Sequence, residues 1–329
     1  MKIKQHYGWG LFLIMALAPF VLSLYYVNVL TEIFIFAVFA VGLNILVGQT
    51  GLISLGHAAF FGAGAYATGI AASNLSPNIF LIILIGVLIS AVLALVMGFF
   101  AIKANGFYFL MLTLAFAQIV YSIVYQWKDV TGGSNGLSGI PTPVLFGNFE
   151  LSNPVLIYYF ILVVFAIILF IVNRLLHSPL GYVFIGIREN EQRMKSNGYN
   201  TAFYKNLSFL IAGVLGGLAG SLYVIFNSFI SPSDVYWTMS GSVLLMVLIG
   251  GAGTLWGPIV GAAFIVLMET IIGAYTENWM MIIGIIFILF TIFAPKGIVG
   301  MIRKAEFKLF KKKTRAILEP IKQQTKTDG

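Results

Sequence analysis

The stretch GLNILVGQTGLISLGHAAFFGAGAY, residues 42–66, decides the fold because polar side chains and many glycines lie inside a long apolar region. Polar side chains at membrane depth are costly unless a partner or water satisfies them, so they tend to face a bundle interior or a cavity. Glycine permits close helix approach, or a local break that frees backbone groups for a ligand. Two interpretations fit: the lining of a passage through a membrane, or a packing interface whose polar groups bond to neighbouring backbone.

The stretch supplies two sets of candidate residues. The candidates for the polar lining of the passage are Asn44, Gln49, Ser54 and His57. The glycines expected to give close packing or backbone access are Gly48, Gly51, Gly56, Gly62 and Gly64.

The composition is that of a polytopic membrane protein. Of 329 residues, 60% are hydrophobic and 9% are charged, whereas soluble domains carry about 25% charged residues. We therefore expect an all-α transmembrane bundle over residues 1–295 and a basic cytoplasmic tail over residues 296–329. The net charge of +8 comes mostly from that tail and describes topology rather than affinity for nucleic acid. The absence of cysteine excludes disulfides, thiolate metal sites and thiol catalysis.

Apolar runs of about 20 residues predict about ten spans. They are Trp9–Val27, Thr31–Val47, Gly51–Ala72, Ile79–Ile102, Phe107–Tyr125, Pro154–Asn173, Leu207–Phe226, Val235–Gly250, Leu255–Thr270 and Trp279–Pro295. If the glycine-rich segments 51–72 and 235–250 are re-entrant, eight or nine crossings remain.

Basic residues predict the orientation, because Lys and Arg near span ends are retained in the cytoplasm. Lys2, Lys4, Lys103, the segment 174–206 and the tail are therefore expected inside. The loop 127–153, which has one Lys against Asp129 and Glu150, is expected outside. Both termini are then cytoplasmic.

Several kinds of chemistry lack their sequence signals. No GxxxxGK[ST] sequence for ATP binding and no HExxH or CxxC sequence occurs. The histidines lie far apart at positions 6, 57 and 177, so we expect neither catalytic residues nor a metal site. The scarcity of ionisable residues deep in spans disfavours proton coupling. A pump of this kind would take its energy from another chain.

The polar segment Arg174–Asn206 stands out among the loops. Ser178-Pro179 is a helix start signal, the run from Tyr182 has helical composition, and Gly198 is a plausible C-cap. One interpretation is an ordinary solvated loop. The other is a short exposed helix that docks into a groove on a cytoplasmic ATPase.

Four motifs give the chain a close resemblance to a known family. They are the stretch 42–66, TGGSNGLSGIP at 131–141, SPLGYVFIGIRENEQRMKSNGYNTAFYK at 178–205 followed by GVLGGLAGSLY at 213–223, and GGAGTLWGPIVGAA at 250–263. Together they cover nearly the whole membrane domain. With them the chain resembles the permease subunits of branched-chain amino-acid ABC importers, the LIV or HAAT class, and within it the longer permease type.

The resemblance implies an assembly in the lipid bilayer of a bacterial or archaeal cytoplasmic membrane. Its partners would be a second permease subunit, two cytoplasmic ATPase subunits and an extracellular or periplasmic binding protein. ATP and Mg would be bound by the ATPases, and no cofactor or nucleic acid by this chain. The binding protein would deliver a hydrophobic amino acid, and ATP hydrolysis would rock the two permeases between outward- and inward-facing states.

The resemblance also implies which residues contact the ATPase. The expected coupling residues are Arg188, Glu189, Glu191, Arg193 and Gly198. ABC importers carry an EAAxxxG pattern in their coupling helix. Here Glu191 precedes Gly198 by seven positions instead of six and Gln192 occupies the Glu position, which leaves the docking contacts open.

Other functions remain as alternatives. Related permeases of the class carry urea or short amides, and a stand-alone channel or secondary carrier would use residues 42–66 as a filter or broken helix. The segment 174–206 favours the importer, because a self-sufficient carrier needs no docking helix.

Overall fold

The computed structural model describes residues 15–104, 106–145, 150–276, 278–293 and 297–301. These residues form an all-α structure with isolated β-bridges and no strand. The helices in chain order are α2 (Leu24–Asn44), η1 (Ile45–Thr50), α3 (His57–Asn74), α4 (Ile79–Ala101), α5 (Phe107–Gln126), α6 (Lys128–Thr131), η2 (Gly133–Asn135), α7 (Pro154–Leu176), α8 (Pro179–Ser196), α9 (Thr201–Asn227), η3 (Pro232–Val235), α10 (Trp237–Gly250), α11 (Trp256–Gly273) and α12 (Trp279–Phe293).

Asparagine side chains begin three of the long helices. Asn78 accepts hydrogen bonds from the backbone N–H groups of the first turn of α4, Asn153 caps α7 ahead of Pro154, and Asn200 caps α9. An N-cap side chain satisfies backbone donors that have no partner inside the helix. These caps fix where each helix leaves its loop.

Six described helical segments are long and apolar enough to cross a membrane. They are Leu24–Thr50, Ile79–Ala101, Phe107–Gln126, Pro154–Leu176, Thr201–Asn227 and Trp256–Gly273. The helices α3, α10 and α12 are shorter or less apolar and complete the bundle. The chain is thus a multi-pass helical membrane protein.

The boundary between the first two predicted spans is wrong. Residues 15–21 are helical, the helix breaks at 22–23, and α2 begins at Leu24, so the predicted loop between Val27 and Thr31 is helix. Asn28 lies within α2 and is partly buried, so it does not end the span. Lys2, Lys4 and the tail, apart from residues 297–301, lie outside the described residues.

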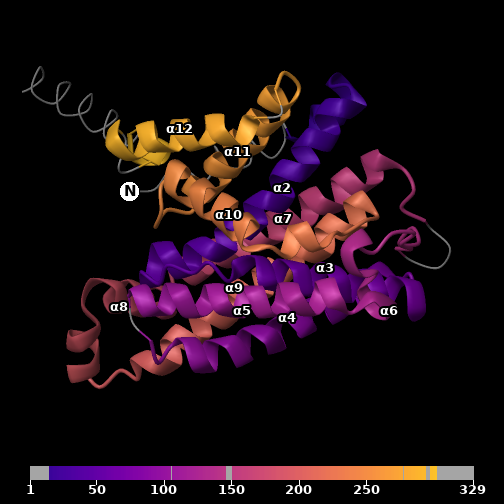
Figure 1. The fold of residues 1–329 in the computed structure, drawn as a ribbon. Helices are drawn as coiled ribbons and strands as arrows, with labels where there is room; N and C mark the ends of the chain where they lie inside the picture. Colours follow the sequence, from indigo (N-terminus) through magenta and orange to yellow (C-terminus); the bar gives the residue numbers. More distant parts are fainter. Residues whose placement is uncertain (1–14, 105, 146–149, 277, 294–296, 302–329) are drawn as a thin grey trace, which may run out of the picture.

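The centre of the bundle is made by α2, α3 and α9 (Figure 1). Here α3 and α9 approach so closely that a Cβ added at Gly220 would lie 1.9 Å from the Phe61 carbonyl oxygen. A Cβ at Gly64 would lie 2.2 Å from the Gly217 oxygen. Small residues allow such approach and provide the packing contacts that hold membrane helices together.

The two ends of the bundle carry different elements. Figure 1 shows α8 at one end and α6, within the predicted external loop, at the other. A backbone bridge between Leu137 and Ile230 ties this loop to the segment that follows α9. The helices α4, α5 and α7 expose most of their residues, whereas α2 is buried from Ile33 to its end.

Candidate functional site

The end of α2 is a π-helical turn. α2 passes into η1, which ends at Gly51 with φ of +75°, and the Gly51 and Leu52 N–H groups both donate to the Leu46 carbonyl. The Thr50 hydroxyl also donates to Leu46, at 2.7 Å. Single π-helical turns are frequent at functional sites. The turn places Gly48 and Gln49 at the junction of three segments of the chain.

The first partner of this turn is the connection between α10 and α11. Asn44 accepts a hydrogen bond from the Gly253 N–H at 2.8 Å and donates to the Thr254 carbonyl at 3.0 Å, while Gln49 donates to the Gly253 carbonyl at 3.2 Å. A Cβ at Gly48 would lie 2.1 Å from Asn44 Oδ1 and 2.4 Å from the Gly253 nitrogen. Asn44 and Gln49, two of the polar residues in the stretch 42–66, thus bond to backbone of a neighbouring segment, as expected for a packing interface.

The second partner is Arg188 from α8. One guanidinium nitrogen of Arg188, Nη1, donates to the Gly48 carbonyl, and the stem of the side chain lies against Gly51. A Cβ at Gly253 would be 2.9 Å from the same nitrogen. A cation is favoured at the C-terminal end of a helix, where carbonyl groups lack partners. Arg188 therefore points into the chain and joins three of the four motifs.

Beyond Arg188, α8 is broken at Asn190. This residue has φ of −161° and ψ of 95°, and its Oδ1 accepts the Arg193 N–H at 2.9 Å, as an N-cap does. A second short helical piece, residues 191–196, follows and ends before Gly198, which has φ of +87°. The N–H groups of Gly198 and Tyr199 close this end on the carbonyls of Lys195 and Met194.

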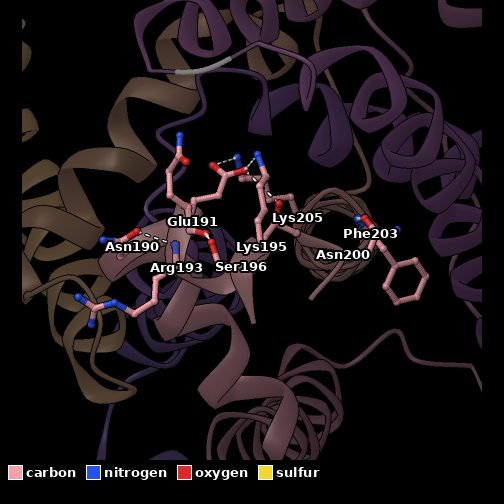
Figure 2. Close-up of polar contacts among 10 residues, drawn as sticks. Asn190, Glu191, Arg193, Lys195, Ser196, Asn200, Phe203 and Lys205 are labelled. Atoms are coloured by element: carbon pink, nitrogen blue, oxygen red, sulfur yellow. Dashed lines mark hydrogen bonds and ion pairs between the residues drawn. The ribbon is translucent and has the colours of Figure 1, made fainter. Parts of the chain in front are cut away.

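Glu191 binds this second piece to α9 (Figure 2). Its carboxylate contacts the Lys205 ammonium at 2.5 Å, the Lys195 ammonium at 3.0 Å and the Thr201 hydroxyl at 3.1 Å. Partial burial raises the pKa of Glu191, but the hydrogen bonds from Lys205 and Lys195 outweigh it and lower the pKa to about 2. The Lys205 side chain is 5% exposed and that of Glu191 is 28% exposed, so the lysine end of this ion pair is buried and the carboxylate end is partly in contact with solvent.

Glu189 and Arg193 differ from Glu191 because they are exposed. Neither forms an ion pair with any residue in the described ranges. Gly198 is exposed as well. Of the five expected coupling residues, Glu191 is partly buried and the other four are exposed; among these four, Arg188 also donates a hydrogen bond to Gly48.

Ser54 lies in the segment between the π-helical turn and α3, and His57 is the first residue of α3. Both are fully buried, and Ser54 accepts the Gly56 N–H at 3.1 Å. The His57 ring stacks on Phe39, with centroids 5.0 Å apart, and its nitrogens have no hydrogen-bond partner among the described side chains and backbone. Their role in a passage stays a prediction.

The other candidate glycines lie at close contacts. A Cβ would be 2.8 Å from the Thr113 oxygen at Gly56 and 2.5 Å from Val235 at Gly62, and Gly64 faces Gly217. Sequence reasoning missed the partners Gly253, Thr254 and Lys205. The glycines of the segment 250–253 were the available signal, since they allow a backbone close enough for Asn44 to bond to it.

The comparisons with known proteins agree with each other. A family model described as branched-chain amino acid transport system, permease component, matches residues 25–291. The high-affinity branched-chain amino acid transport system permease proteins LivM of Salmonella typhimurium and Escherichia coli are each 29% identical in an alignment of 324 residues that covers 92% of this chain and 76% of theirs. A probable branched-chain amino acid transport permease protein LivM of Methanocaldococcus jannaschii is 26% identical in an alignment of 242 residues that covers 66% of this chain and 68% of that one. No solved structure matches the chain.

Proposed function

We infer that this chain, which belongs to the family of branched-chain amino acid transport system permease components, is the transmembrane subunit of an ATP-driven importer for these amino acids. It would work with a second permease subunit, two cytoplasmic ATPases and a binding protein on the outer side. The sequence contains no GxxxxGK[ST] signal, and in this proposal ATP and Mg would be bound by the ATPases.

We propose about ten spans with both termini in the cytoplasm of a bacterium or archaeon. Six long apolar segments and the shorter apolar helices α10 and α12 support this number, and α3 and the apolar N-terminal run that includes residues 15–21 would be the remaining two spans. The positions of α8 and α6 at opposite ends of the bundle support the assignment of the loops 174–206 and 127–153 to opposite sides (Figure 1). The proposed membrane is the cytoplasmic (inner) one.

The observation that carries the mechanism is the contact of Arg188 with Gly48. The exposed side chains of Glu189 and Arg193 would contact a groove of the ATPase, whereas Arg188 and Glu191 hold α8 to the membrane helices. A push on residues 191–196 would then reach α9 through Lys205, and α2 and the α10–α11 connection through Gly48. In this arrangement the docking surface, formed by Glu189 and Arg193, would be connected to the centre of the bundle directly through side-chain contacts of α8.

Uptake by the assembled importer tests the proposal. The tagged chain is expressed with its genomic neighbours, purified and reconstituted in liposomes, and uptake of leucine, isoleucine, valine and urea is measured with and without ATP. We expect the ATPase to copurify and the branched-chain amino acids to enter only with ATP and loaded binding protein. Solute movement by the chain alone, without ATP, would contradict the importer.

The docking surface has its own test. Arg193→Glu reverses the charge of an exposed residue and should weaken copurification of the ATPase. Glu150→Lys, an exposed charge reversal in the predicted external loop, is the matched control and should leave copurification unchanged. If copurification of the ATPase falls equally in both variants, the surface of α8 is not the docking site.

A further inference from the structure

The described part of the chain ends at the contact between η1, Arg188 and the α10–α11 connection, here called the coupling junction. Gly297 is buried, and a Cβ added to it would lie 2.5 Å from the backbone nitrogen of Gly251. Its φ of +68° favours glycine, so another residue type would be strained at this contact. Ile298 packs against the core of the bundle, and residues 298–301 are helical. The chain beyond Met301 therefore starts beside the coupling junction.

A displacement of Gly297 would act on the coupling junction directly, because backbone packs on backbone there. Gly251 belongs to the connection whose Gly253 N–H donates to Asn44 at 2.8 Å. Arg188 approaches the same connection, since a Cβ at Gly253 would lie 2.9 Å from its Nη1. Whatever holds Gly297 in place therefore also supports the contacts through which we propose that α8 acts.

Beyond Met301 the sequence combines a high density of basic residues with apolar side chains. Residues 302–329, which lie outside the described ranges, contain nine Lys or Arg and three Asp or Glu. Three apolar residues and one threonine recur at the three- and four-residue spacing of one helix face, namely Phe307, Phe310, Thr314 and Ile317. Basic residues recur at the same spacing on the adjacent side, namely Lys308, Lys312 and Arg315. The sequence thus predicts a basic amphipathic segment.

An anionic lipid surface is the partner that matches both features of this segment. The headgroups of the cytoplasmic leaflet attract Lys and Arg, and the boundary between headgroups and acyl chains accepts an apolar face. A nucleic acid would bind the basic residues but leave Phe307 and Phe310 in water. The lipid surface is also within reach, because the segment begins a few residues after the end of the membrane helix α12.

We propose that residues 302–318 bind the anionic headgroups of the cytoplasmic leaflet and thereby hold Gly297 against Gly251. The inference rests on the proposed function, which places this end of the bundle in the cytoplasm, and it adds a lipid partner that regulates the coupling junction. When the segment is bound, residues 297–301 are held by the bundle on one side and by the membrane on the other. When it is released, Gly297 is free to leave Gly251, and a push from the ATPase on α8 is transmitted less completely.

A single cysteine reports lipid contact, because the natural chain has none. Thr314→Cys lies on the apolar side of the segment and is labelled with a dye whose emission shifts to the blue in a lipid surface. The assembled importer is placed in nanodiscs of phosphatidylcholine with or without phosphatidylglycerol. We expect the blue shift with phosphatidylglycerol only, and its loss in about 1 M salt, where the Debye length is about 3 Å. No shift with phosphatidylglycerol, or a shift in both lipids that disappears when the ATPase is removed, would overturn the proposal.

Two pairs of substitutions separate binding of this segment from general attraction of the charged tail. Lys308→Gln with Lys312→Gln removes two charges inside the segment, and Lys322→Gln with Lys326→Gln removes two beyond it. Each Lys near an anionic surface changes binding about fivefold, so the first pair should lower the ratio of bound to free tail roughly 25-fold. The second pair should change it much less. Equal loss in both pairs would mean that no defined segment binds and would contradict the proposal.

Uptake of leucine per ATP hydrolysed tests whether the bound segment supports the coupling junction. In vesicles that contain phosphatidylglycerol, we expect this ratio to be roughly fivefold lower or more in the first pair than in the second. Gly297→Ala should lower it too while the dye still reports lipid contact. Gly284→Ala, where nothing lies within 4 Å of the added carbon, is the control and should not.

An unchanged ratio in the first pair would refute the link between lipid and the coupling junction. If the unmodified importer moves no branched-chain amino acid, the proposed function fails instead, and the dye still decides whether the tail binds lipid.

Discussion

At the scale of single residues, Arg188 joins the surface segment to the membrane helices. Its guanidinium donates to the Gly48 carbonyl, and a hydrogen bond that involves a charged group contributes about 1.5–3 kcal/mol. We expect Arg188→Ala to lower amino-acid uptake per ATP hydrolysed by roughly tenfold or more. Arg188→Lys, which keeps the charge but not the planar fork, should lie between Ala and wild type. Full coupling in Arg188→Ala would show that force reaches α2 by another route.

Glu191 gives the junction of α8 and α9 a dependence on pH. Its pKa is lowered from 4.5 to about 2 in the folded chain. The ion pairs therefore stabilise the fold above pH 4.5, and this contribution is lost as pH falls from there toward 2. We expect Glu191→Gln to lower the melting temperature in detergent at neutral pH. The difference in melting temperature between variant and wild type should disappear at low pH, as the wild-type carboxylate is protonated. A constant difference across that window would contradict the role given to the ion pairs.

At the scale of elements, the π-helical turn η1 packs so closely against the α10–α11 connection that Gly48 has no room for a side chain. A Cβ at Gly48 would lie 2.1 Å from Asn44 Oδ1, so Gly48→Ala must displace Asn44 from the α10–α11 connection. Overpacking of this kind costs about 1–3 kcal/mol. The control is Gly241→Ala in α10, where nothing lies within 4 Å of the added carbon. We expect thermal unfolding at lower temperature for the first variant only, and similar melting of both would mean that the turn relaxes freely.

The break in α8 depends on the cap supplied by Asn190. Asn190→Ala removes the acceptor for the Arg193 N–H, a change that costs about 0.5–2 kcal/mol at helix N-caps, whereas Asn190→Asp keeps an acceptor. If residues 191–196 dock as a preformed helix, Asn190→Ala should weaken ATPase binding roughly two- to tenfold and Asn190→Asp should restore it. Titration of the permease with purified ATPase measures this. Equal weakening by both variants would point to a contact of the amide itself.

The same elements show how far the sequence leads. The start of α8 after Ser178, its end before Gly198 and the apolar helices follow from local signals, namely a cap, a glycine and hydrophobic runs. The break at Asn190 does not follow from such signals, because an asparagine in a polar helical run gives no local sign of its backbone angles. The bonds of Asn44 to Gly253 and Thr254 join residues about two hundred positions apart, and only the packed bundle brings them together.

At the scale of the whole molecule, the mechanism requires α8 and the loop 127–153 to lie on opposite sides of the membrane. Ser138 and Asn197 are both exposed, and the cysteine-free chain lets each carry a single reporter thiol. We expect Ser138→Cys to react with an impermeant maleimide in intact cells. Asn197→Cys should react only after the membrane is opened, because the positive-inside rule keeps its Lys- and Arg-rich segment in the cytoplasm. Labelling of both cysteines in intact cells would place α8 outside the cell, where no ATPase could reach it. That result would also contradict the coupling role proposed for the contact of Arg188 with Gly48.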